Sequence, residues 1–224
     1  MADNRYFEEI GKNFSAWSDP YDVSQRILLF ERLLRKVSNF EHAIEIGCGF
    51  GGMTEYFVRL FKDLTVLDVS LDLASNTGNK YGVPHLIGDA THLEISDNCY
   101  GVVVSSECIE HTGDPIEAVR QMYRILKPGG WLVISTPNKI WGPLLKVGQF
   151  LNVRKFKDKE IFVTPHEMKQ ILRELGCVEF WFDGCHLLPW QIPFIKPILS
   201  RMDKFGSRLW WITINFGFVA KKPG

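Results

Sequence analysis

The sequence of 224 residues has no net charge, no cysteine pair at CxxC spacing and no long apolar segment. Its 26 lysines and arginines balance 26 aspartates and glutamates, so no overall basic face for nucleic acid is expected. No apolar run approaches the length of about 18 residues that a membrane-spanning helix needs. The N-terminal stretch MADNRYFEEIGK lacks the apolar core of a signal peptide. We therefore expect neither a nucleic-acid partner nor a transmembrane segment.

Cysteine is scarce and unpaired in its spacing. The five cysteines are Cys48, Cys99, Cys108, Cys177 and Cys185. An odd number cannot close a complete disulfide framework, and scattered thiols suit a reducing compartment. The sequence therefore predicts a cytoplasmic protein with free thiols. No cluster has metal-ligand spacing, so no metal is expected.

The length fits one substantial domain rather than two. We expect residues 1–224 to form a single domain in three parts: an N-terminal lid and helix at 1–39, a cofactor-binding core at 40–138, and a substrate side at 139–224 that includes a cap insertion at 184–209.

Apolar runs of strand character alternate with segments of helical periodicity through the core. Strands are predicted at 42–46, 64–68, 84–87, 101–105 and 131–135, and two more at 178–182 and 211–219. The intervening helices are predicted at 52–61, 70–79 and 115–126, with a further helix beginning at 164–167. This alternation is typical of a Rossmann-like, doubly wound α/β fold with a parallel sheet.

Capping residues predict where several helices begin. Asp22, with Gln25 three positions later, is expected to start a helix before the first strand. Asp114 followed by Pro115 is expected to cap another, with Glu117 completing a capping box.

The organising motif is the stretch IEIGCGFG at 44–51. Gly47, Gly49 and Gly51 follow an apolar strand and precede a helix, so the backbone is expected to turn sharply there. A ligand against this turn would meet bare backbone N–H groups and the positive end of the next helix. The spacing alone also satisfies the GxGxxG pattern of dinucleotide sites, so it does not identify the ligand.

Three acids around the turn bear on the ligand. Asp68 ends the second strand, where a carboxylate can accept hydrogen bonds from a ribose diol. This suits NAD and S-adenosylmethionine equally. Glu45, by contrast, would repel a pyrophosphate and suits a cationic amino-acid group. Asp89 could accept a hydrogen bond from an adenine amine.

Five stretches in order carry a family resemblance: EIGCGFG, VLDVS, GDA, SSECIEHTGDP and LKPGGWLVISTPN. Together they resemble the class I S-adenosylmethionine-dependent methyltransferases, in particular the quinone-biosynthesis subgroup. The resemblance implies a seven-stranded sheet whose last strand is antiparallel. It also implies S-adenosyl-L-methionine as cofactor and S-adenosyl-L-homocysteine as product.

The resemblance further assigns residues to the parts of the cofactor. It places Glu45, Gly47, Gly49 and Gly51 at the methionine part, Asp68 at the ribose, Val69, Asp89 and Ala90 at the adenine, and Ser106 near the methionyl amino group.

His111 is the candidate general base because it follows the carboxyl end of the fourth strand, where ligand sites gather in open α/β sheets. Glu107 and Glu110 are near enough in sequence to orient or tune its imidazole. The alternatives are that His111 packs on the cofactor or caps the helix that begins at Pro115.

The acceptor side is apolar in sequence. The insertion at 184–209 and the N-terminal aromatics predict a lid over a hydrophobic substrate, although sheet packing, a dimer contact or peripheral membrane contact would explain them too. We expect methyl transfer to a small-molecule or lipid-like acceptor, preferably to a hydroxyl, by a monomer or homodimer. The alternatives are an NAD(P)-dependent oxidoreductase and a non-catalytic scaffold that binds S-adenosylmethionine.

Overall fold

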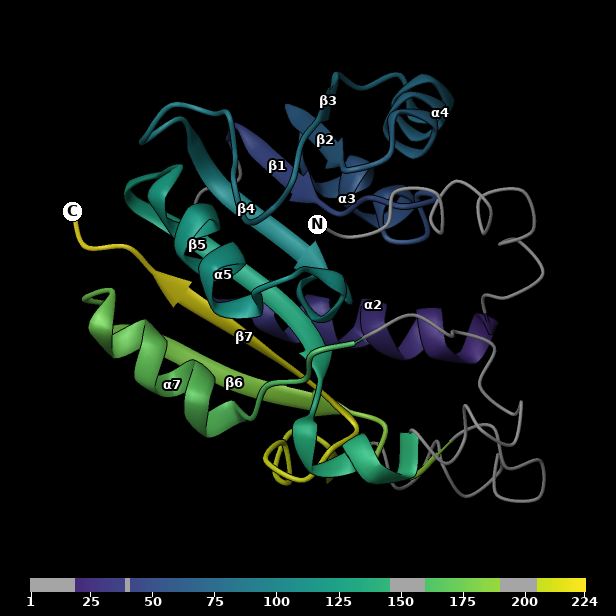
Figure 1. Cartoon of the computed structure of the whole chain (residues 1–224), viewed down its shortest axis with the longest axis vertical. Coiled ribbons are helices and arrows are strands. Elements are labelled where there is room, and N and C mark those ends of the chain that lie inside the picture. Colours follow the sequence, from purple (N-terminus) through teal and green to yellow (C-terminus); the bar gives the residue numbers. More distant parts are fainter. Residues whose placement is uncertain (1–18, 39–40, 146–159, 190–204) are drawn as a thin grey trace.

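The computed structural model describes residues 19–38, 41–145, 160–189 and 205–224 (Figure 1). Two expectations lie wholly or mostly outside these residues: the aromatic N-terminal lid and most of the insertion at 184–209. Among the described residues no helix is long and apolar enough to cross a membrane.

The centre of the molecule is a seven-stranded sheet in the order β3-β2-β1-β4-β5-β7-β6 (Figure 1). The strands are β1 (Ala43–Ile46), β2 (Leu64–Asp68), β3 (His85–Ile87), β4 (Tyr100–Ser106), β5 (Leu126–Pro137), β6 (Glu179–Cys185) and β7 (Asn215–Lys221). Strands β1 to β5 pair in parallel, whereas β7 is antiparallel to both β5 and β6. The predicted fold class, including the antiparallel last strand, is confirmed.

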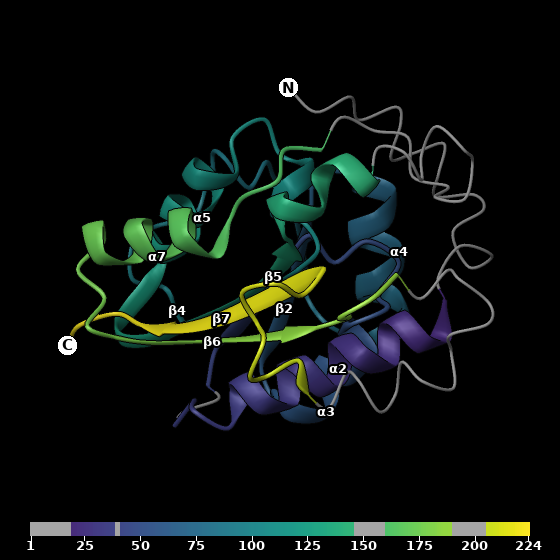
Figure 2. The same cartoon turned by 90° about the horizontal axis from the view of Figure 1, so that it is seen from below.

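Helices cover both faces of this sheet, as Figure 2 shows. On one face lie α2 (Pro20–Leu34) and α3 (Thr54–Leu60), and on the other α5 (Pro115–Arg124) and α7 (Pro165–Glu174). The remaining helix, α4 (Leu71–Tyr81), packs against β2, β3 and α3. Two short 3-10 turns, Ile109–His111 and Lys139–Trp141, follow β4 and β5.

Each face of the sheet has its own hydrophobic core. On β4, Val102 and Val104 pack with the α2 side, whereas Val103 packs with the α5 and α7 side, and all three are buried. Successive side chains of a strand point to opposite faces, so a continuous valine run suits a strand that is covered on both.

The start of α2 differs from the prediction. Asp19, not Asp22, is the N-cap, and its carboxylate accepts a hydrogen bond from Tyr21 N at 2.9 Å. Pro20 then occupies the first helical turn, where its fixed φ is favourable and its missing N–H costs nothing. Asp22 therefore lies inside the first turn and forms an ion pair with Arg26, at 2.8 Å.

Two other predicted helix starts can be compared with the structure. Asp114 caps α5 as expected, through bonds to the N–H groups of Ile116 and Glu117. The Glu117 carboxylate, however, accepts a hydrogen bond from Gln121 rather than turning back to close a box. At α7, Thr164 and Glu167 do form a complete capping box.

Strand β5 is longer than expected, because the LKPGG stretch belongs to it rather than to a loop. The pairing with β4 shifts register between Tyr100 and Val102, which accommodates the extra residues as a bulge. Gly129 adopts φ +76° there, and a Cβ at Gly130 would lie 2.8 Å from a backbone oxygen. The glycines thus permit a tightly bulged strand.

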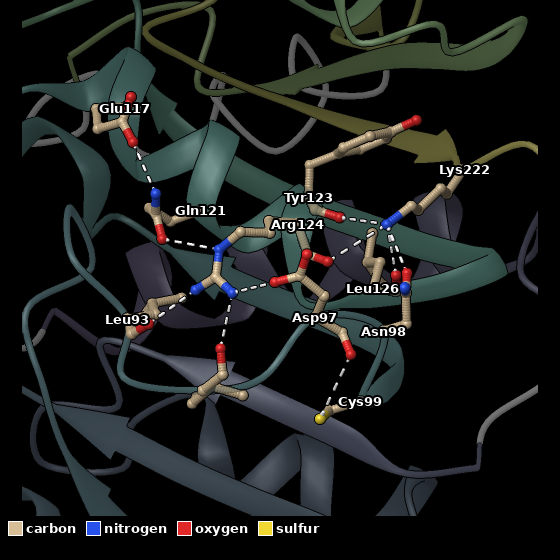
Figure 3. Close-up of polar contacts among 11 residues, drawn as sticks. Leu93, Asp97, Asn98, Cys99, Glu117, Gln121, Tyr123, Arg124, Leu126 and Lys222 are labelled. Atoms are coloured by element: carbon tan, nitrogen blue, oxygen red, sulfur yellow. Dashed lines mark hydrogen bonds and ion pairs between the residues drawn. The ribbon is translucent and has the colours of Figure 1, made fainter.

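A network at the amino ends of β4 and β5 ties the last strand to helix α5 (Figure 3). The Arg124 guanidinium donates to the carbonyl oxygens of Leu93 and Ile95 and forms an ion pair with Asp97 at 2.5 Å. Lys222 donates to three carbonyl oxygens at the end of α5 and the start of β5, and to the Asn98 side chain. We call this set of contacts the amino-end network.

Candidate active site

The predicted site residues gather at the carboxyl ends of the parallel strands. The Gly88 N–H, after β3, donates to the backbone oxygen of Asp68 at 3.0 Å. The Ser105 hydroxyl, near the end of β4, donates to the Ile46 oxygen at 2.9 Å. The first bond joins the ends of β3 and β2, and the second joins the ends of β4 and β1. Open parallel sheets place ligands at this edge.

The glycine turn leaves β1 with all three glycines at positive φ, +77° at Gly47, +50° at Gly49 and +77° at Gly51. Its N–H groups are not bare, contrary to expectation. Gly47 N donates to Leu67 O at 2.8 Å, Gly49 N to Asp68 Oδ2 at 2.9 Å, and Gly51 N to Cys48 O at 2.9 Å. The turn is closed against β2, so these glycines contribute backbone shape and not hydrogen-bond donors.

The reason for glycine differs along the turn. A Cβ at Gly47 would lie 2.2 Å from the Cys108 Sγ, and one at Gly51 would lie 2.5 Å from the Tyr81 ring. At Gly49 nothing lies within 4 Å of the Cβ position. Backbone that is both left-handed and uncovered leaves room for a ligand to approach closely.

Glu45 lies beneath this turn and is only 2% exposed. Thr54 Oγ1 donates to its Oε2 at 2.6 Å. Burial raises the pKa of Glu45 to about 8, although the Thr54 hydrogen bond opposes that rise. A buried carboxyl without a cationic partner among the described residues fits a cationic ligand, which would return it to the ionised form.

Asp68 is 6% exposed, and both of its oxygens accept backbone hydrogen bonds. Oδ2 accepts from Gly49 N and Oδ1 from Ser70 N, at 2.9 and 3.0 Å. Burial nevertheless raises the pKa of Asp68 above its usual value. Each carboxylate oxygen has a second lone pair, so the group can still accept from a ligand hydroxyl. The partly exposed Val69 follows it at the strand end.

Asp89 and Ala90 lie just beyond β3. One Asp89 oxygen accepts hydrogen bonds from the N–H and the hydroxyl of Thr91, at 2.8 and 2.7 Å. Ala90 is buried in the core cluster that contains Ile46 and Leu67. The local turn therefore fixes the Asp89 carboxylate beside the strand end where the sequence placed it.

His111 ends the short turn after β4, and its side chain is 16% exposed. Its Nε2 lies 3.9 Å from Glu110 Oε1, which is too long for a hydrogen bond. Glu110 is 1% exposed and accepts from Thr136 Oγ1 at 3.0 Å. Burial, with the nearby Glu107 charge, raises the pKa of Glu110 well above its usual value. In this geometry the Glu110 carboxyl therefore makes no direct hydrogen bond to His111 Nε2.

Glu107 bonds to the neighbouring strands and not to His111. Its Oε1 accepts from Ser135 Oγ on β5 at 2.8 Å, and its Oε2 accepts from Asn215 Nδ2 on β7. The backbone of Glu107 has φ +51°, a strained value for a residue with a side chain. Burial raises the pKa of Glu107 to about 7, and the Arg26 guanidinium opposes part of that rise.

Four residues beside Glu107 were missed by sequence reasoning: Asp22, Arg26, His186 and Asn215. Asp22 bonds to Arg26 at 2.8 Å and to His186 Nε2 at 3.1 Å. His186, just after β6, is fully buried. The i,i+4 spacing of Asp22 and Arg26, and a lone asparagine at the start of an apolar strand, are the only signals that the sequence offered. We call Glu107 and these four residues the acceptor-side cluster.

Within the described part of the chain, no group of three or more His, Cys, Asp or Glu side chains could hold a metal ion. All five cysteines are free thiols.

Comparison with known proteins connects this geometry to a family. The profile of a family described as a methyltransferase domain matches residues 44–134. A demethylmenaquinone methyltransferase of Chlamydia trachomatis is 24% identical over 222 residues, which cover 92% of this chain and 93% of the relative. Residues 44–134 of the chain carry a methyltransferase domain. It resembles the quinone-biosynthesis subgroup, as the sequence motifs indicated.

Two other relatives widen the comparison. A ubiquinone biosynthesis O-methyltransferase of Hydrogenovibrio crunogenus is 26% identical over 59% of this chain and 60% of its own length. The N-methyltransferase NodS of Bradyrhizobium japonicum, solved with S-adenosylhomocysteine, shares the fold with a TM-score of 0.69 and 16% identity over the whole of both chains. The chain matches 60% or less of the length of the first three curated relatives.

Proposed function

We propose that this methyltransferase-family chain transfers a methyl group from S-adenosylmethionine to a small-molecule or lipid-like acceptor, at a hydroxyl. The choice of cofactor depends on one observation: the carboxyl of Glu45 is buried beside an open glycine backbone. A sulfonium cofactor with an amino-acid end supplies the positive charge that this carboxyl lacks. S-Adenosyl-L-homocysteine would be the product.

The proposed contacts follow the strand ends. Glu45 and the turn at Gly47, Gly49 and Gly51 would hold the methionine part, and Asp68 the ribose hydroxyls. Val69, Asp89 and Ala90 would border the adenine. Hydrogen bonds from Gly88 N to Asp68 O and from Gly47 N to Leu67 O support this order, because they join the ends of β3 and β1 to the end of β2.

A hydrogen-bond direction supports the proposed place of Ser106. The Ser135 hydroxyl donates to Glu107, so in the 3.2 Å contact between the two serine oxygens Ser106 is the donor. The lone pairs of Ser106 Oγ then remain available as acceptors. An acceptor at this position suits the N–H groups of a methionyl ammonium.

The cofactor supplies an activated methyl group, so the protein must align the acceptor oxygen and exclude water. Such positioning is worth about 7–11 kcal/mol, and a general base adds roughly a hundredfold to ten-thousandfold. His111 remains the prediction for the base, at the edge of the site and without a hydrogen bond from Glu110.

A nicotinamide-dependent oxidoreductase is disfavoured by the same carboxyl. A pyrophosphate on the glycine turn would lie near Glu45 and would hold its proton in place, leaving the buried acid without function. The acceptor atom is less constrained, since one relative is named as an O-methyltransferase and another as an N-methyltransferase. A non-catalytic scaffold would keep the cofactor site but would lack the residues that bind a methyl acceptor.

Three further expectations remain predictions. The acceptor is expected to be small or hydrophobic, the chain to act as a monomer or homodimer, and its location to be cytoplasmic. The five free thiols agree with a reducing environment.

Titration calorimetry with S-adenosylhomocysteine and with NADH tests the cofactor half of the proposal. We expect the sulfur ligand to bind with release of a proton near pH 7, because its ammonium would lower the raised pKa of Glu45. Repeating the titration in buffers of different ionisation enthalpy measures that proton. Tight binding of NADH with no response to S-adenosylhomocysteine would overturn the proposal.

A further inference from the structure

The acceptor-side cluster contains more hydrogen-bonding capacity than the described residues use. Asn215 is 3% exposed, and its Nδ2 donates to Glu107. Within the described part of the chain, its buried Oδ1 has no hydrogen-bond partner, and neither has the buried Nε of Arg26. A buried acceptor and a buried donor left unsatisfied near one carboxyl are unusual in a folded protein. They indicate a ligand group that both donates and accepts.

The position of Glu107 separates it from the cofactor contacts proposed above. It follows Ser106 on β4, but its carboxylate lies beside β5 and β7, on the side of the sheet away from β1 and β2. Glu107 is partly exposed, whereas its partners Ser135 and Asn215 are buried. Of these three residues, Glu107 is therefore the one that a bound acceptor can contact.

The surrounding charges favour a neutral hydroxyl over an ammonium group as that acceptor. Asp22 forms an ion pair with Arg26 and a hydrogen bond with His186. The ion pair holds the guanidinium of Arg26 close enough to Glu107 to act on its charge. A cationic acceptor would be repelled by Arg26 and could not accept from its Nε. A hydroxyl can donate to Glu107 or to Asn215 Oδ1 and accept from Arg26.

We propose that Glu107 is the proton acceptor for the methyl-accepting hydroxyl, with Asn215 and Ser135 as its positioning residues and Arg26 as the group that stabilises the developing oxyanion. This rests on the proposed function and places the base at Glu107 instead of His111. The acceptor O–H proton passes to a Glu107 oxygen as the oxygen forms its bond to the methyl carbon. The S–C bond breaks, and its electron pair goes to sulfur, which becomes a neutral thioether.

The electrostatic setting agrees with this role. The titratable and charged groups around Glu107 are Asp22 and Arg26 on α2, His186 after β6, and Glu110 on the turn after β4. Burial outweighs the guanidinium and raises the pKa of Glu107 to about 7, so near neutral pH the carboxyl is divided between its two forms. A base with such a pKa is effective at physiological pH.

The first experiment follows the Glu107 carboxyl by 13C NMR in glutamate-labelled protein, assigned with Glu107→Gln. Catechol, a neutral probe with two hydroxyls, is added to protein saturated with S-adenosylhomocysteine. We expect catechol to shift the Glu107 resonance and lower its pKa, because a donated hydrogen bond favours the carboxylate. An unmoved Glu107 resonance at saturating catechol overturns the proposal. If S-adenosylhomocysteine did not bind, the proposed function itself would be contradicted.

The second experiment compares Glu107→Gln with His111→Gln, using Glu174→Gln on the exposed face of α7 as the control. In Glu107→Gln, catechol affinity should fall about tenfold while affinity for S-adenosylhomocysteine stays within about twofold. With labelled S-adenosylmethionine and catechol, the rise in rate through about pH 7 should disappear in Glu107→Gln and persist in His111→Gln. If the rise in rate persisted in Glu107→Gln and was lost in His111→Gln, the general base would be His111.

Asn215→Ala separates positioning from folding. Loss of the donated Nδ2 hydrogen bond should raise the pKa of Glu107 and move the inflection of the rate to higher pH. An unchanged Glu107 pKa in a folded Asn215→Ala protein would remove Asn215 from the proposed role.

Discussion

The two ends of the sheet use polar groups in opposite ways. In the amino-end network, Lys222 and Arg124 are saturated by carbonyl oxygens and an acid, and they fasten the last strand to α5. At the carboxyl end, Glu45 and Glu110 are buried and Glu107 is partly exposed, and the pKa values of all three carboxyls are raised. There, buried atoms of Asn215 and Arg26 have no hydrogen-bond partner among the described residues.

This contrast shows how a cluster of polar residues that stabilises the fold differs from one that binds a ligand. A network whose donors and acceptors are all paired gains nothing from a ligand and stabilises the fold alone. Carboxyls whose pKa is raised by burial, by contrast, reduce the stability of the free protein at neutral and higher pH. Such an arrangement is favourable only when a ligand supplies the missing charge or hydrogen bond.

The largest expected effect comes from removing the acid under the glycine turn. Glu45→Gln should weaken binding of S-adenosylhomocysteine by about tenfold to a hundredfold, because a charged hydrogen bond is worth roughly 1.5–3 kcal/mol. It should also abolish the proton released on binding. Calorimetry measures both, with Glu174→Gln as the matched control. Wild-type affinity in Glu45→Gln would exclude Glu45 from the cofactor site.

Asp68→Asn tests the next strand end. The amide keeps one acceptor oxygen but loses the charge, so cofactor affinity should fall by about tenfold. Because Asp68 also accepts from Gly49 N and Ser70 N, the free energy of unfolding should fall by about 1 kcal/mol as well. Urea unfolding and calorimetry distinguish the two effects. Unchanged affinity would remove Asp68 from the site.

A change in the amino-end network should show the reverse pattern. Lys222→Met leaves three carbonyl oxygens without the lysine donor, which should lower the free energy of unfolding by about 1–2 kcal/mol. Affinity for S-adenosylhomocysteine should not change, and urea unfolding with calorimetry checks both. A large loss of affinity at wild-type stability would contradict the division between the two ends.

The last prediction concerns the pH dependence of stability. Glu45 and Glu107 have folded pKa values of about 8 and about 7, above those of the unfolded chain. Their contribution is complete below about pH 4.5 and is lost as pH rises toward 8, since the folded state then binds the extra protons. Urea unfolding between pH 5 and 8, the range in which these carboxyls titrate, should show this decline in the free energy of unfolding. The decline should be shallower in Glu45→Gln; an equal slope would mean that Glu45 titrates normally.

Much of the site was predictable because it depends on local order along the chain. Glu45, Asp68 and Asp89 each end or adjoin a strand, and parallel strands bring their carboxyl ends to one edge. The glycines were recognised from their spacing. The assumption that their N–H groups would be bare was wrong, because the closing bonds to Leu67 and Asp68 come from another strand.

The acceptor-side cluster was not predictable for a related reason. Asn215 and Glu107 are 108 positions apart, and they meet because β7 returns antiparallel between β5 and β6. Arg26 lies beside them because α2 packs across β6 and β7.

By itself the sequence determined the order of strands and helices, the sharp glycine turn and the acids around it, because hydrophobic periodicity and residue geometry act locally. Only the tertiary structure decided which donors are used, which carboxyls are deprived of charge partners and which distant residues share a site. Desolvation and long-range pairing depend on what packs against a group, and that is fixed when the sheet closes around its final strand.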